Sequence, residues 1–317
     1  MKVALYTISY QGLWYADDFT PLKQLIPKVA EFGYDGISLS GKRHHASPLD
    51  LDKKACNKIK QLADSAGLEL VALDTYSNFM DPVMEHREAQ LVWLRELIRL
   101  ADNLDIRIVK VFAGWMGTTL RNRKGAYDRL YRLLLPYATD VERWNWIKEC
   151  IKEGAKWADE YDITLALQTH GPPVRFGYED TLTMIKEIDS DRVKMCLDIG
   201  LGCFDQFTQQ NDKYIAKAVK ECSDLIVYSH FNGEFRETAH GDFIQEPYDA
   251  PELTPPGGSL INYEAFVREL KKIGYNGYLA YEVCGPVLVN HQLQGVEEVD
   301  RLVKAALGYM KKLIAKV

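Results

Sequence analysis

The sequence lacks any excess of positive charge and any long apolar run. Its 317 residues carry 39 Lys and Arg against 45 Asp and Glu, a net charge of −6. Such a surface is poorly suited to bind nucleic acid backbones or anionic membranes. No apolar run approaches a membrane span, and the opening stretch MKVALYTISY is too short and too polar for the hydrophobic part of a signal peptide. We therefore expect a cytoplasmic protein without a nucleic-acid or membrane partner.

The sequence also lacks paired cysteines and a nucleotide-binding glycine motif. None of the six cysteines forms a C-x-x-C pair, and most lie in apolar segments, which is typical of reduced thiols. No G-x-G-x-x-G motif follows the first predicted strand. A disulfide framework is therefore not indicated, and a doubly wound open sheet is the less favoured of two possible α/β folds.

What the chain does contain is a recurring unit: a helical pattern, a turn at Gly, Asn or Asp, and a short apolar run. Gly33, Gly67 and Gly274 stand where the residue after a helix needs a positive φ. The following runs are apolar on both faces, as in buried parallel strands. Eight strands are predicted, near residues 2–8, 36–40, 69–74, 107–113, 163–169, 193–198, 224–230 and 277–283. Residues 1–317 are therefore expected to form one α/β domain, a single (β/α)8 TIM barrel.

Two gaps in this pattern are longer than ordinary connections. They follow the fourth and seventh predicted strands and cover residues 114–141 and 231–261. Long excursions at the catalytic end of a barrel usually serve as lids or substrate walls. A structural insertion or an oligomer contact is the alternative.

Candidate functional residues stand at the strand ends, where the active sites of TIM barrels lie. The fifth to eighth strands end in residue types that bind metals, namely Gln168, Asp198, His230 and Glu282. One such residue alone is more often structural, but four from adjoining strands suit a divalent ion. Because side chains alternate along a strand, His170 points the same way as Gln168, one layer apart. We therefore predict a metal site, with His170 facing the substrate.

Six further residues are candidates for contacting substrate. Lys42 and His45 belong to GKRHH after the second strand, where a solvated basic loop is an equally good explanation. Lys110 lies inside the fourth strand, and a buried Lys needs a carboxylate or the substrate as partner. Aromatic residues near strand ends are core residues more often than ligands. The predicted substrate-binding set is Lys42, His45, Lys110, Trp115, Glu234 and His291.

The motifs LALQTHG, CLDIG, SHFNGEF and YEVCGP resemble those of the xylose isomerase-like TIM barrels, which include sugar isomerases and epimerases. In those enzymes the fifth strand ends in a Glu that binds the metal and moves a proton, and the Asp of the sixth is followed three residues later by His. This chain has Gln168 and Leu201 there. Its Q-x-H strand end, its early W-Y pair and its EHREAQL helix are most similar to the catalytic alpha subunit of bacterial C-glycoside deglycosidases.

This resemblance implies a lyase that abstracts the proton next to the ketone of a 3-oxo-glycoside and eliminates the C1 substituent. His170 would be the base, Glu282 a second catalytic residue, and the cofactor one divalent ion, Mn²⁺ in preference to Mg²⁺, Co²⁺ or Zn²⁺. A metal-dependent sugar isomerase or epimerase is the first alternative, since it begins with the same proton abstraction. A non-catalytic barrel subunit is the second. A smaller beta subunit is implied as partner, with a homo-oligomer as the alternative.

Overall fold

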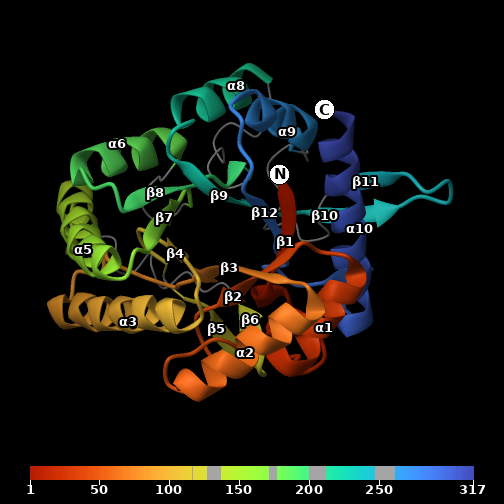
Figure 1. Ribbon diagram of the computed structural model, residues 1–317, viewed down its shortest axis with the longest axis horizontal. Coiled ribbons are helices and arrows are strands. Elements are labelled where there is room, and N and C mark those ends of the chain that lie inside the picture. The colour runs from red at the N-terminus through yellow and green to blue at the C-terminus, as the bar shows by residue number, and fades with distance from the viewer. Residues whose placement is uncertain (116, 127–136, 171–176, 200–211, 247–260) are drawn as a thin grey trace.

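The computed structural model describes residues 1–115, 117–126, 137–170, 177–199, 212–246 and 261–317 (Figure 1). Eight parallel strands close into a barrel in the order β1-β12-β9-β8-β7-β4-β3-β2, which confirms the predicted TIM barrel. The predicted strands all form, most of them somewhat shorter than expected. They are β1 (Lys2–Tyr6), β2 (Gly36–Ser40), β3 (Glu69–Asp74), β4 (Ile108–Val111), β7 (Thr164–Gln168), β8 (Val193–Cys196), β9 (Ile226–Phe231) and β12 (Tyr278–Tyr281).

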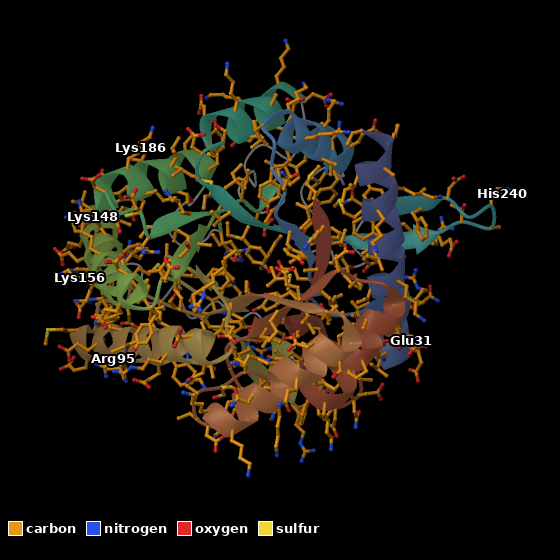
Figure 2. The ribbon with its side chains drawn as sticks, viewed as in Figure 1. Glu31, Arg95, Lys148, Lys156, Lys186 and His240 are labelled. Carbon is orange, nitrogen blue, oxygen red and sulfur yellow. The ribbon has the colours of Figure 1, made fainter. Side chains whose placement is uncertain are left out.

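Helices surround the barrel and turn their charged side chains outward (Figure 2). They are α1 (Leu22–Phe32), α2 (Lys53–Ala66), α3 (Met84–Asn103), α5 (Asp140–Glu160), α6 (Tyr178–Ile188), α8 (Asp212–Glu221), α9 (Tyr263–Lys272) and α10 (Val296–Lys316), with a short 3-10 helix η1 (Thr7–Tyr10) after β1. Gly33 and Gly67 end α1 and α2 with φ of 90° and 67°, as predicted. None of the helices in the described ranges is both long enough and apolar enough to cross a membrane.

The interior of the barrel changes from apolar to polar along the strands. Ala4, Ala166 and Ala280 belong to one buried cluster with Cys196 and Tyr228. Side chains alternate across a strand, so the residue two positions further on points into the barrel again. On β7 and β9 those next inward positions carry an amide and an imidazole, and the one directly after β12 carries a carboxylate. The polar side chains are therefore gathered in one layer at the C-terminal ends of the strands.

The two long insertions each contain a β-hairpin, β5 (Thr119–Arg121) with β6 (Lys124–Ala126) and β10 (Glu234–Glu237) with β11 (Phe243–Glu246). The second hairpin packs beside α10 and projects past it (Figure 1). A third hairpin joins β13 (Leu288–Val289) to β14 (Gln292–Leu293). Residues 127–136 and 247–260 lie outside the described residues, so the expected role of the insertions as lids stays a prediction.

Candidate metal and active site

Three of the four predicted metal ligands come together at the barrel mouth. Asp198, His230 and Glu282 each offer one ligand atom, and these atoms all lie within 4.8 Å of one another. The three side chains are buried, with exposed fractions of 0 %, 0 % and 7 %. Asp198 stands two residues after β8, His230 lies in β9 and Glu282 directly follows β12, and these strands are neighbours in the barrel. A carboxylate, an imidazole and a second carboxylate at this spacing are a donor set for a divalent cation.

Gln168, the fourth predicted ligand, borders the same group. Its Nε2 donates a hydrogen bond of 3.0 Å to Asp198 Oδ2 and lies 3.5 Å from His230 Nδ1. Its Oε1 is buried and has no hydrogen-bond partner among the described residues. A 180° rotation of the amide about χ3 exchanges the positions of Nε2 and Oε1. The oxygen then faces Asp198 and His230 and is available as a metal ligand. The four residues therefore fit a cation with two carboxylates, one imidazole and one neutral oxygen.

The electrostatics of His230 show how strongly this group attracts positive charge. Its Nδ1 lies 3.5 Å from Glu282 Oε2, and its Nε2 lies 3.1 Å from Asp74 Oδ1. Burial alone would lower the pKa of His230, but the two carboxylates raise it to about 9. Burial alone would raise the pKa of Glu282, but the charges of His230 and Lys110 lower it. In the metal-free protein, a proton on His230 thus supplies the positive charge between the carboxylates that a bound cation would otherwise supply.

Asp74 is the functional candidate that the sequence analysis missed. It ends β3 and lies beside Lys110 of β4 in the strand register. Both side chains are completely buried, and Lys110 Nζ lies 3.6 Å from Asp74 Oδ1. This carboxylate is the partner that the buried Lys110 was predicted to need. The signal was available, because Asp74 closes LVALD as Asp198 closes CLD, but only the fifth to eighth strand ends were read for ligands.

His170, just after the end of β7, packs against two aromatic rings. The ring of His170 meets Phe112 edge-on at 5.0 Å and Trp115 at 5.2 Å between centroids. Phe112 and Trp115 are stacked at 5.5 Å. The charge of His170 contributes to the lowered pKa of Glu282, so the two predicted catalytic residues act on one another electrostatically. Trp115, predicted to bind substrate, therefore lies beside the predicted base.

A polar network lies next to these aromatic residues, with the Tyr76 ring 6.4 Å from that of Phe112. Lys42 Nζ lies 3.7 Å from the centroid of the Tyr76 ring. Burial and the nearby charge of Lys110 lower the pKa of Lys42 to about 7. The hydroxyl of Tyr76 is hydrogen-bonded to Tyr6 at 2.6 Å and to Ser40 at 2.7 Å. Lys42 is therefore a partly covered amine held against a ring rather than a freely solvated loop residue.

The remaining predicted substrate-binding residues have different surroundings. His45 is buried, with Nε2 3.1 Å from the carbonyl oxygen of Thr20, and burial lowers its pKa to about 4. Glu234 begins β10. His291 is exposed, with φ of 62°, in the turn between β13 and β14. Their proposed contacts with substrate stay predictions.

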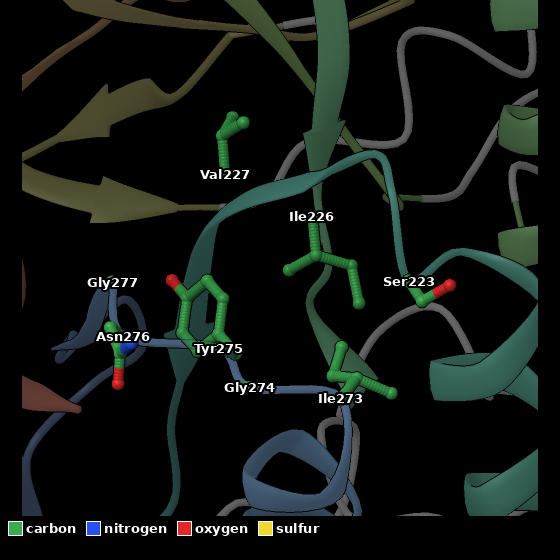
Figure 3. Close-up of a pocket in the computed structure, with 8 residues that line it drawn as sticks. All are labelled: Ser223, Ile226, Val227, Ile273, Gly274, Tyr275, Asn276 and Gly277. Atoms are coloured by element: carbon green, nitrogen blue, oxygen red, sulfur yellow. The ribbon is translucent and has the colours of Figure 1, made fainter.

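A hollow at the other end of the barrel is separate from this site (Figure 3). It is lined by Ser223, Ile226, Val227 and residues 273–277. These residues precede or begin β9 and β12, whereas the candidate ligands stand where the same strands end. None of the predicted site residues lines it, so we assign it no catalytic part.

Comparisons with known proteins identify the class to which this barrel belongs. A family model described as xylose isomerase-like TIM barrel matches residues 26–313. The chain therefore belongs to the xylose isomerase-like TIM barrel family, as the strand-end motifs predicted. No curated protein matches the sequence.

Solved structures share the fold over nearly their whole length. A D-psicose 3-epimerase from Clostridium cellulolyticum H10, solved with D-tagatose, has 19% identity and a TM-score of 0.69, with 99% of each chain covered. A D-psicose 3-epimerase solved in the presence of D-fructose has 15% identity, a TM-score of 0.69 and the same coverage. A 3-keto-D-glucoside 4-epimerase from E. coli has 16% identity and a TM-score of 0.64, covering 96% of this chain and 99% of that one. At such identities the likeness shows the fold alone.

Proposed function

We propose that the protein is a divalent-metal-dependent lyase that acts on 3-oxo-glycosides. The observation that carries the proposal is the amide of Gln168, which stands 3.0 Å from Asp198 at a strand end facing Glu282 and His230. Epimerisation by two bases removes a proton on one face of a carbon and returns one on the other, and an amide can do neither. Elimination needs a single base, which His170 supplies.

The residues at the mouth have two separate proposed roles: four of them bind the metal ion, and His170 transfers the proton. Asp198, His230, Glu282 and Gln168 would hold one divalent ion, with Mn²⁺ preferred over Mg²⁺, Co²⁺ or Zn²⁺. When bound, such an ion supplies Lewis acidity to the substrate ketone and so acidifies the adjacent C–H bond. Two carboxylates balance its charge, whereas a third in place of Gln168 would make the site negative and the ion a weaker Lewis acid.

The proposed reaction uses His170 twice. The imidazole takes the proton from C2, and the C–H electrons form the enolate of the 3-ketone. The ketone then re-forms, a C1–C2 double bond is made, and the C1 substituent leaves with its bonding pair. The proton on His170 passes to the departing group, so the enzyme ends as it began. Phe112 and Trp115 restrict the ring of His170, and Lys42, which is held against Tyr76, would bind substrate hydroxyls.

A sugar isomerase or epimerase is the second candidate. The buried carboxylate of Glu282 supports it, since it could act as a second base, and the solved relatives named above are epimerases. Purified protein with Mn²⁺ is incubated with a 3-oxo-glycoside and, separately, with D-fructose, while bound metal is quantified. Release of aglycone with an unsaturated keto sugar supports the lyase. Ketose epimerisation without release supports the second candidate, and metal binding without either reaction supports a non-catalytic subunit.

The proposal also includes association with a smaller beta subunit, with a homo-oligomer as the alternative. Large apolar side chains are exposed near the junction of α3 and α5, with Met84 57%, Tyr137 75% and Val141 70% exposed. Such side chains are more typical of covered surfaces than of free ones. Light scattering of the chain alone and with a co-expressed small subunit tests this. A fully active monomer would contradict it.

A further inference from the structure

We infer that Asp74 is a positioning residue for His230, holding the Nε2 proton so that Nδ1 faces the metal site. The inference rests on the metal site of the proposed function, but not on which reaction follows. It concerns a contact that spans the barrel, because β3 and β9 lie opposite one another in the strand order. Asp74 Oδ1 is 3.1 Å from His230 Nε2, and both side chains are fully buried.

The two nitrogens of His230 have different neighbours. Nδ1 faces Gln168 and Glu282, while Nε2 faces Asp74. Nε2 and Asp74 Oδ1 are within hydrogen-bond distance, but the Nε2–H bond is not in line with Oδ1 in this geometry. The contact is an ion pair when His230 is protonated, and a turn of the ring would make it a hydrogen bond. A neutral imidazole binds a metal through the nitrogen without a proton, and an acceptor at the other nitrogen decides which one that is.

Without Asp74 the opposite tautomer would be favoured. The Glu282 carboxylate, 3.5 Å from Nδ1, would then be the nearest acidic acceptor and would draw the proton to Nδ1. That proton would stand between His230 and the other ligands and would have to be displaced before a cation could bind. Asp74 therefore competes with Glu282 for the one proton that the neutral, metal-bound imidazole keeps, and it leaves the lone pair of Nδ1 on the side of the other ligands.

Lys110 and Ser38 are the other partners of the Asp74 carboxylate. Lys110 Nζ lies 3.6 Å from the same Oδ1 that faces His230, and Ser38 donates a hydrogen bond to Oδ2. The position of Lys110 against the Phe112 ring, 3.6 Å from its centroid, fixes the amine beside the carboxylate. Ser38 still holds Oδ2 when Lys110 is replaced, so the carboxylate stays in place as an acceptor.

Three single variants separate this role from a merely structural one. Asp74→Asn removes both the ion pair with Lys110 and the charged acceptor of His230. Lys110→Met breaks the same ion pair but leaves the acceptor in place. Asp300→Asn is the matched control, since it breaks a 2.7 Å ion pair between Asp300 of α10 and Lys28 of α1, outside the barrel. The double variant Asp74→Asn/Lys110→Met avoids an unpaired buried charge and replaces Asp74→Asn if that variant does not fold.

The measurement is the dissociation constant for Mn²⁺ of metal-free protein, by competition with a fluorescent chelator. We expect Asp74→Asn and the double variant to bind about 10–100-fold more weakly. Lys110→Met should bind Mn²⁺ as tightly as the wild type or more tightly, because it removes a positive charge near the site. Asp300→Asn should leave the dissociation constant unchanged. In Zn²⁺-loaded wild type, the ¹⁵N spectrum of the His230 ring, assigned by its loss in His230→Gln, should show the proton on Nε2.

Equal weakening in Asp74→Asn and Lys110→Met would reveal a general structural effect and overturn the inference. Unchanged affinity in Asp74→Asn, or a proton on Nδ1, would overturn it as well while leaving the proposed metal site in place. A wild-type protein that binds no divalent ion would remove the metal site itself, and with it both the inference and the proposed function.

Discussion

Thr169 and Asp198 are joined by two reciprocal hydrogen bonds. The backbone N–H of Asp198 donates to Thr169 Oγ1 at 2.9 Å, and the same hydroxyl donates to the carbonyl oxygen of Asp198 at 3.0 Å. Thr169 points away from the site, as the alternation along β7 predicts, and it is fully buried. These two hydrogen bonds connect the C-terminal ends of β7 and β8 to one another. They therefore keep Gln168 beside the Asp198 carboxylate.

The first prediction concerns this contact. Thr169→Val should lower the free energy of unfolding by about 1–3 kcal/mol, because it removes two buried hydrogen bonds to the backbone of Asp198. It should also weaken metal binding, since Asp198 is no longer held in place. Urea denaturation and metal titration check both effects. Thr169→Ser keeps the hydroxyl and serves as the control; if it weakens metal binding as much as Thr169→Val, the hydroxyl is not what holds Asp198.

The second prediction concerns the proposed base. His170→Ala should keep the metal and lose turnover by roughly two to four orders of magnitude. The control is His240→Ala, an exposed residue of the loop between β10 and β11 (Figure 2). Metal content, thermal melting and turnover are measured on both variants. A fully active His170→Ala would rule out the proposed mechanism.

The third prediction concerns the neutral ligand. Gln168→Glu adds a carboxylate beside Asp198 and Glu282, so the divalent ion should bind more tightly and act as a weaker Lewis acid. Elimination should fall, and exchange of the proton next to the ketone should become detectable in D₂O, because a second base is now present. Gln168→Met, which is neutral and has no amide oxygen, controls for size. Unchanged elimination in Gln168→Glu would contradict the role given to the amide.

The fourth prediction follows from the raised pKa of His230, about 9 in the folded protein. An unfolded imidazole has a pKa of about 6.5, so the stabilisation from this proton in metal-free protein is complete below about pH 6.5 and lost as the pH rises through 9. A cation must displace the same proton, so apparent metal affinity should rise about tenfold per pH unit over this window.

Urea denaturation of metal-free protein and calorimetric titration with Mg²⁺ between pH 6.5 and 9.5 test the pH dependence. His230→Gln carries no titrating group at this position and should lose both trends. A wild-type affinity for Mg²⁺ that stays level between pH 6.5 and 9 would show that no proton leaves His230 when the ion binds.

The sequence by itself determined the barrel and most of its candidate ligand positions. The eight strands can be predicted from apolar runs bounded by turns. Their order in the barrel follows from the βα connections. Alternation along each strand is local, so it already placed Gln168 toward the barrel axis and Thr169 into the wall. The residues at four strand ends, read this way, included the cluster formed by Asp198, His230 and Glu282.

Only the tertiary structure decided which of these groups touch across the barrel. Asp74 and His230 lie on opposite strands and far apart in the chain, and only closure of the sheet brings their side chains within 3.1 Å. The partner of Lys110 depends on the register between β3 and β4, and this register cannot be predicted from the local sequence pattern. The covered position of Lys42 against Tyr76 likewise depends on how two loops fold over the mouth. Local periodicity specifies which way a side chain points, whereas its charge environment is set by non-local packing.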